Sequence, residues 1–153
     1  MTGIFAKSKK DGYLVGISLA HTALLAAAAC LDLSESTTAT TAFICLHAFL
    51  ICVNYQCIAH NYLHNPFFKS KNLNRAFAIV NSPLLVFPSS LYKEHHLNHH
   101  RYTNDRQDQH GKTKDLSSIF RFGKKGQPES FLMYSLLNPW RTDIGQYYEM
   151  DEE

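Results

Sequence analysis

The sequence has few cysteines, almost no net charge, and no charged residue in two long stretches near its start. Its 15 basic and 13 acidic side chains nearly balance, so the overall charge gives no case for nucleic-acid binding. The four cysteines form no CxxC pair, which argues against a zinc knuckle or a disulfide framework. They lie in or beside the uncharged stretches, where cysteine is a small apolar filler. At 153 residues the chain has room for one domain.

The two uncharged stretches are long enough to cross a lipid bilayer as helices. They comprise residues 13–31 and 38–59. At 1.5 Å per residue the first spans about 28 Å, close to the thickness of a hydrocarbon core. A signal peptide also begins with basic residues, but its apolar part is only about 7–15 residues long. The sequence therefore predicts an all-α integral membrane protein with two transmembrane helices, joined to interfacial and cytoplasmic helices.

The distribution of lysine and arginine indicates which way the helices cross. Three lysines precede the first stretch, whereas the connection Asp32–Thr37 carries two acids and no basic residue. Basic residues return only after the second stretch. Because cytoplasmic loops are enriched in lysine and arginine, we expect the N-terminus and the residues after 59 to lie in the cytoplasm.

Two later apolar segments are too short to cross a membrane. Residues 76–91 are interrupted by Pro83 and Pro88, and this predicts a broken segment that lies in the membrane interface. Residues 130–137 are shorter still, and we expect a helix there to be broken by the Asn-Pro-Trp sequence at 138–140.

Five histidines stand at spacings that bring imidazole rings together on helix faces. They are His60, His64, His96, His99 and His100. His64 lies four positions after His60, and His99 and His100 lie three and four positions after His96, so on a helix each group shares a face. His95 could replace or supplement His96, because it also lies four positions before His99. Imidazole suits iron, zinc, copper and nickel, so the histidines alone do not choose the metal.

The residues between His60 and His64 argue against a hydrolytic zinc site. Zinc proteases place a glutamate directly after the first histidine of an HExxH helix, where it serves as the general base. Here the intervening residues are Asn61, Tyr62 and Leu63. The hydrolytic zinc interpretation therefore lacks both its motif and its base.

The histidine groups resemble the first two histidine boxes of membrane fatty acid desaturases and related hydroxylases. Residues 60–64 (HNYLH) match the HxxxH box, and residues 96–100 (HLNHH) match the HxxHH box. The similarity covers roughly residues 38–108 and continues more faintly to Trp140. It implies a non-haem di-iron centre held by these histidines, with no other catalytic side chain. It also implies O₂ as co-substrate, a membrane lipid or acyl substrate, and a ferredoxin or cytochrome b5-type electron donor.

The sequence departs from the family pattern in one respect. Family members carry a third histidine box, whereas the only histidine after His100 is His110. We therefore expect residues 1–153 to be one partial desaturase-like domain that binds iron weakly and turns over slowly or not at all. Two alternatives stay open: a carotenoid or alkane hydroxylase or ketolase of the same superfamily, and a catalytically inactive membrane module.

Four further polar residues carry expectations of their own. Asn104 and Asp105 follow the second box and are candidates to hydrogen-bond the free ring N–H of a ligand histidine. His21 and His47 lie inside the two uncharged stretches. We expect them to be neutral and to hydrogen-bond across helices, because ionisable groups at membrane depth are rarely left alone.

Overall fold

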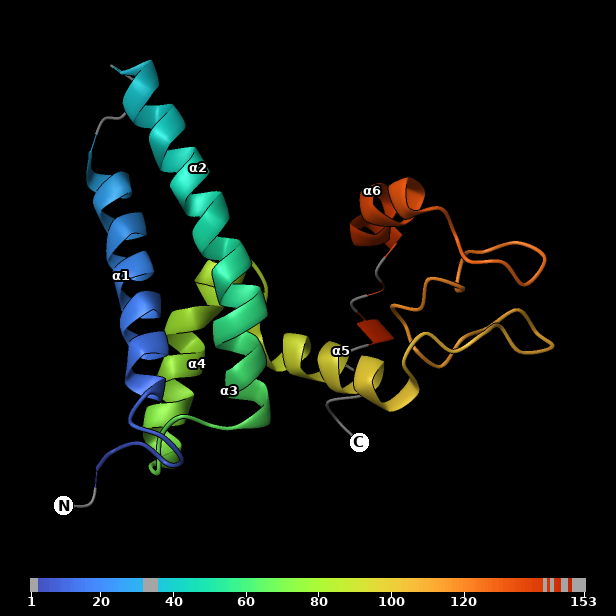
Figure 1. Cartoon of the computed structure of the whole chain (residues 1–153), viewed down its shortest axis with the longest axis horizontal. Coiled ribbons are helices and arrows are strands. Elements are labelled where there is room, and N and C mark those ends of the chain that lie inside the picture. The colour runs from blue at the N-terminus through green and yellow to red at the C-terminus, as the bar shows by residue number, and fades with distance from the viewer. Residues whose placement is uncertain (1–2, 32–35, 142, 144, 147–148, 150–153) are drawn as a thin grey trace. The chain divides into compact units, whose positions relative to one another are not determined.

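The structure is a computed structural model that describes residues 3–31, 36–141, 143, 145–146 and 149. Its helices are α1 (Asp11–Cys30), α2 (Thr37–Val53), the π-helix η1 (Asn54–Ala59), α3 (His60–His64), α4 (Lys71–Leu85), α5 (Ser89–Tyr102) and α6 (Phe131–Arg141), as Figure 1 shows. Among the described residues, the only extended pairing is an isolated bridge between Phe5 and Phe68. The predicted all-α class is confirmed. Residues 32–35 of the predicted polar connection lie outside the described residues.

Two helices are long and apolar enough to cross a membrane, as the sequence predicted. The first is α1, and the second is the continuous helix of 28 residues that α2, η1 and α3 form from Thr37 to His64. A helix of that length measures about 42 Å, whereas the hydrocarbon core is about 30 Å thick. The second helix is therefore longer than a bilayer crossing needs, and it continues to His64, beyond the predicted end at residue 59.

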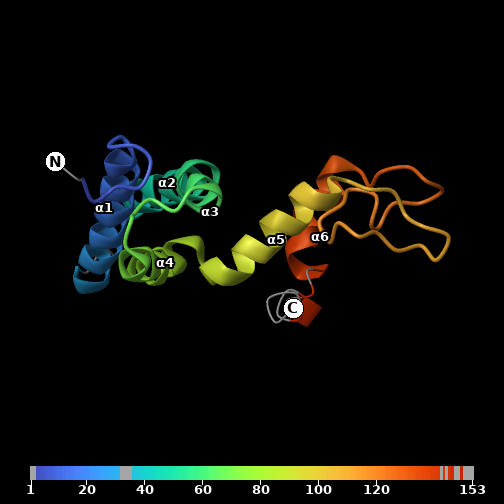
Figure 2. The same cartoon turned by 90° about the horizontal axis from the view of Figure 1, so that it is seen from below.

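The chain divides into two compact units at Ser89 and Ser90. In the first unit α1 and α2 run side by side in opposite directions, and α4 packs beside them (Figure 1, Figure 2). In the second unit α5 is followed by a long loop and then by α6.

Polar side chains tie the helices of the first unit together. Asn81 of α4 accepts hydrogen bonds at Oδ1 from Ser18 Oγ at 2.7 Å and from Asn54 Nδ2 at 2.9 Å. Its own Nδ2 donates to Asn54 Oδ1 at 3.0 Å. A second link joins α1 to α2, where His21 Nε2 lies 2.8 Å from His47 Nδ1. The predicted hydrogen bonding of His21 and His47 across helices is confirmed.

An apolar cluster supports the end of the second membrane helix. Ile58, Phe67 and Phe77 form its buried centre. Tyr62 packs against Phe67 and Phe77, and its hydroxyl donates to the carbonyl of Asn74 at 2.7 Å. Because these contacts come from η1, α3, α4 and the connection between them, they fix the direction in which α3 leaves the bundle.

The predicted break within residues 76–91 is present, but it begins only after α4 has passed Pro83. Helix α4 continues through Pro83 and ends two residues later, where Val86 adopts a left-handed φ of 53°. The Val86 N–H then donates to the Pro83 carbonyl at 3.2 Å, which closes the last turn. Pro88 directly precedes α5. The break between the two helices is therefore confined to residues 86–88.

The predicted break at residues 138–140 is wrong, because α6 continues to Arg141. Contacts made by the helix with the rest of its unit account for this. Tyr134 Oη donates to the Ser117 carbonyl at 2.6 Å, and Arg141 Nη1 lies 2.7 Å from Glu129 Oε1. The two anchors lie about two turns apart, on either side of the proline, so they hold the helix across it.

Candidate metal centre

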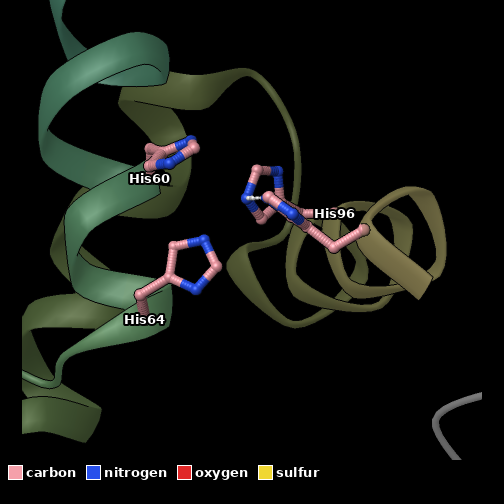
Figure 3. Close-up of side chains that lie close together, drawn as sticks. His60, His64 and His96 are labelled. Atoms are coloured by element: carbon pink, nitrogen blue, oxygen red, sulfur yellow. Dashed lines mark hydrogen bonds between the residues drawn. The ribbon is translucent and has the colours of Figure 1, made fainter. Parts of the chain in front are cut away.

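The first histidine pair stands on α3, directly after the π-helical turns of η1. Figure 3 shows the rings of His60 and His64 on the same side of their helix, one turn apart. Their ring centroids are 5.0 Å apart, and each ring offers a nitrogen within 4.8 Å of a nitrogen of the other. The predicted i, i+4 pairing is present in the structure.

The π-helical turns position this pair. A π-helix is rare, and single π turns inside α-helices are frequent at functional sites. Here η1 places Asn54 and Ile58 in the interior of the first unit, where Asn54 bonds to Asn81 and Ile58 joins the apolar cluster. Because these two contacts hold η1 in place, they also fix the rotation of the following helix α3 about its own axis. The π-helix was not foreseen from the sequence, which carries no proline or glycine in this segment.

The second pair, on α5, consists of His96 and His100. Their Nε2 atoms lie 3.0 Å apart, and the dashed line in Figure 3 marks this hydrogen bond at His96. Histidine nitrogens bind metals at about 2.0–2.1 Å, so two such ligands at a right angle are about 3 Å apart. The separation of the two Nε2 atoms therefore fits adjacent ligands of one metal ion.

His99 is held in a different way from its neighbours. Its Nδ1 lies 2.9 Å from Oδ2 of Asp115 and 3.2 Å from the hydroxyl of Ser117. A carboxylate accepts only, so the Nδ1 atom carries the proton and donates it. The lone pair of the neutral ring is then on Nε2. Histidine ligands of metals are commonly held from behind in this way, by a carboxylate on the other nitrogen.

The Asp115 side chain is fully buried, and both of its carboxylate oxygens accept hydrogen bonds. Its Oδ1 accepts from the N–H and hydroxyl of Ser117, both at 2.8 Å, and its Oδ2 accepts from the Asn104 N–H at 2.7 Å. Burial by itself raises the pKa of Asp115, but the hydrogen bonds from Asn104, Ser117 and His99 outweigh burial and bring the pKa below its usual value. The carboxylate is therefore ionised at neutral pH and suited to orient His99.

The loop that carries Asp115 is fastened to α5 by the residues around the second box. Asn98 Nδ2 donates to the Lys114 carbonyl at 3.0 Å, and Asn98 Oδ1 accepts from the Leu116 N–H at 2.9 Å. Asp105 accepts from the backbone N–H groups of Lys114 and Asp115 at 2.8 and 2.9 Å. These contacts fix the position of Asp115 relative to His99.

The expected roles of Asn104 and Asp105 are therefore corrected. In the described residues the carboxylate on a box histidine belongs to Asp115, while Asn104 and Asp105 bond to Asp115 itself and to its backbone.

The predicted common face of His96, His99 and His100 is also only partly present, because the His99 ring turns toward Asp115. His95 lies near the same carboxylate. The pKa of His95 lies below its usual value, because the lowering by burial and by the neighbouring His99 outweighs the raising effect of Asp115.

The donor set fits a histidine-bound metal of the kind that the spacing predicted. Each pair presents nitrogens that can share one ion, and His99 presents a third ring on α5. Which of the five predicted histidines bind a metal stays a prediction. Asp115 and Ser117 were missed by sequence reasoning, since no fixed spacing links them to the second box.

These features indicate the class of the protein, which is a helical membrane protein that carries two pairs of histidines. The comparisons with known proteins then supply the family. The sequence model described as "Fatty acid desaturase" matches residues 36–149, which is more than half of the chain and includes both histidine pairs. The chain belongs to the fatty acid desaturase family. No curated protein and no solved structure matches it significantly.

Proposed function

We propose that the chain acts as a membrane-bound oxidoreductase in lipid metabolism, introducing a double bond into an acyl chain with O₂ as co-substrate. The observation that supports this most is the family match over residues 36–149, within which both histidine pairs fall. An aliphatic C–H bond is not acidic enough for a side-chain base to attack. A bound pair of irons would supply the missing oxidising power, as cofactors do for chemistry that side chains cannot perform.

The residues that would hold the irons are His60, His64, His96, His99 and His100. Within each unit the geometry supports this role, because the nitrogens of each pair can meet on one ion. Asp115 supports it for His99, since it holds the Nδ1–H and leaves Nε2 to bind. The chain's other contributions are to orient the acyl chain and to exclude water.

The membrane helices support a lipid substrate. His60 and His64 stand at the C-terminal end of the 28-residue helix, which at about 42 Å is longer than a hydrocarbon core of about 30 Å. We infer that the first pair lies at the membrane boundary, where an acyl chain enters from the bilayer. The lysines before α1 and the basic residues after α3 favour the cytoplasmic side for this boundary. Electrons would come from a ferredoxin or cytochrome b5-type protein.

The proposal is tested by fatty acid analysis of a host that expresses the chain. Because turnover is expected to be slow, gas chromatography with mass spectrometry should show a small amount of a new unsaturated acyl chain that disappears with His64→Ala or His96→Ala. The matched control is His110→Ala, because His110 is exposed and belongs to neither pair. Lipid unsaturation that the box variants leave unchanged would overturn the proposal. A hydroxylated product would assign the chain to the hydroxylases of the superfamily instead.

A further inference from the structure

Helix α6 carries its apolar side chains on the outside and its polar anchors on the inside. Phe131, Leu132, Leu136 and Trp140 are 85%, 64%, 59% and 86% exposed. The opposite face holds Tyr134, which donates to Ser117, and Arg141, which pairs with Glu129. A surface helix of a globular domain has the reverse arrangement, with its apolar stripe facing the core. The outer face of α6 is therefore built to meet something apolar.

The exposed residues form a continuous stripe. Leu132, Leu136 and Trp140 follow one another at four-residue intervals, so they lie in a row along the helix. Eleven residues make a helix of about 16 Å, which is about half of what a membrane crossing needs. The stripe can therefore rest on or in a bilayer along its length, but α6 cannot span one.

Charge favours a membrane surface as the partner of this stripe. Between Arg121 and Arg141 the sequence has four basic residues and a single acid, Glu129, which is paired with Arg141. The acids of the C-terminal end begin only at Asp143. Of the basic residues, Lys124 and Lys125 are exposed in the turn before α6. A helix with an apolar face, a tryptophan and nearby basic residues is typical of one that lies at the headgroup boundary. A bilayer also fits the rest of this chain, because α1 and the helix from Thr37 to His64 are long and apolar enough to cross one.

We propose that α6 is an interfacial helix whose Leu132–Leu136–Trp140 stripe inserts into the surface of a lipid bilayer, with the adjoining lysines on anionic headgroups. The second unit then has its own attachment to the membrane, in addition to its covalent link to the membrane helices. This inference rests on the exposed stripe and the charges and not on the proposed desaturation. The membrane insertion of α6 can therefore be disproved while the proposed desaturation stands, and the desaturation can be disproved while the insertion stands.

The sequence provides a convenient probe, because Trp140 is the only tryptophan of the chain. The full chain is reconstituted in vesicles of phosphatidylcholine and phosphatidylglycerol, and its tryptophan fluorescence is recorded. We expect quenching by lipids brominated on the acyl chain near the headgroup, and several-fold weaker quenching by aqueous iodide than for free tryptophan. Strong iodide quenching without bromolipid quenching would overturn the proposal. Protection from iodide without bromolipid quenching would also overturn it and would indicate a protein partner, such as a second copy.

Variants separate insertion from mere proximity to lipid. The double variant Leu132→Gln, Leu136→Gln should reduce bromolipid quenching of Trp140 several-fold and raise iodide quenching. Ser135→Gln is the matched control, because Ser135 is exposed on the same helix but outside the stripe. Lys124→Gln with Lys125→Gln should weaken bromolipid quenching in anionic vesicles more than in neutral ones. Equal quenching in the stripe variant and the control would contradict the insertion of the stripe.

Discussion

The Nδ1 atom of His99 lies 2.9 Å from Oδ2 of Asp115, a carboxylate that comes sixteen residues later and is completely buried. The His99 side chain itself is 36% exposed. One edge of the ring is thus fixed in the interior of the second unit while the rest of the ring remains accessible. This is the arrangement that a ligand histidine needs, since its free nitrogen must point in a fixed direction.

The first prediction concerns this contact. Asp115→Ala removes the acceptor of the His99 Nδ1–H and leaves the N–H groups of Asn104 and Ser117 without their partner. We expect metal binding to the second box to weaken about 10–100-fold. We also expect the unfolding free energy to fall by about 1–3 kcal/mol. Co²⁺ titration followed by absorption, together with chemical denaturation, measures the two effects.

A control distinguishes orientation of His99 from general loosening of the loop. Ser118→Ala removes another buried hydrogen bond of the same loop, from Ser118 Oγ to the Asp105 carbonyl at 2.7 Å. It should lower stability and leave Co²⁺ affinity nearly unchanged. In the wild type, ¹⁵N NMR should show His99 protonated at Nδ1. If both variants weaken Co²⁺ binding equally, Asp115 has no orienting role.

The second prediction concerns the polar network inside the membrane bundle. Asn81→Ala leaves Ser18 and Asn54 without their shared partner in α4. Because hydrogen bonds between membrane helices contribute about 0.6 kcal/mol on average and about 1.7 at most, we expect a loss of about 1–2 kcal/mol. Unfolding in mixed micelles measures it. In the double variant with Asn54→Ala the two losses should not add, and full additivity would show that the residues act independently.

The third prediction is a dependence on pH that does not involve the five box histidines. Backbone hydrogen bonds from Lys112 and His110 lower the pKa of Asp108. Since its pKa is lower in the folded chain than in the unfolded chain, the stabilisation is complete above the ordinary aspartate value of about 3.9 and is lost as the pH falls through the lowered value. The amide shift of Lys112 should follow this titration. Asp108→Asn should abolish the titration, and a shift that persists in this variant would contradict the assignment.

The fourth prediction concerns the anchor of α6. Tyr134→Phe deletes the hydroxyl that donates to the Ser117 carbonyl and keeps the ring. We expect the unfolding free energy of the second unit to fall by about 0.5–1.5 kcal/mol, the usual net value of one hydrogen bond. Amide hydrogen exchange in α6 should accelerate while exchange in α5 changes little. Equal acceleration in both helices would mean that the bond supports the whole unit.

The sequence was informative wherever the structure depends on local periodicity. Uncharged runs of membrane length predicted two membrane helices, and histidines four positions apart predicted the pairs on α3 and α5. The hydrogen bond of His21 to His47 followed from the cost of a lone ionisable group at membrane depth. Each of these inferences needs only neighbours along a helix or the surrounding solvent.

The sequence did not predict features that depend on contacts between residues far apart in the chain. Asp115 reaches His99 through a loop held by Asn98 and Asp105, and no spacing rule encodes that loop. Pro139 was expected to end α6, but the contacts of Tyr134 and Arg141 outweigh its local effect. Tertiary contacts of this kind override local preference, which is why the end of α6 was predicted wrongly.

The most direct test of the central claim is the amount of iron that the purified chain binds in anaerobic equilibrium dialysis against Fe²⁺. We predict histidine-bound iron that is lost when His60 and His64, or His96 and His100, are replaced by alanine. The His110→Ala chain should keep it. X-ray absorption on the wild type should show nitrogen ligands at the iron. Iron retained equally by the wild type and by both pair variants would contradict the claim that these histidines hold the metal.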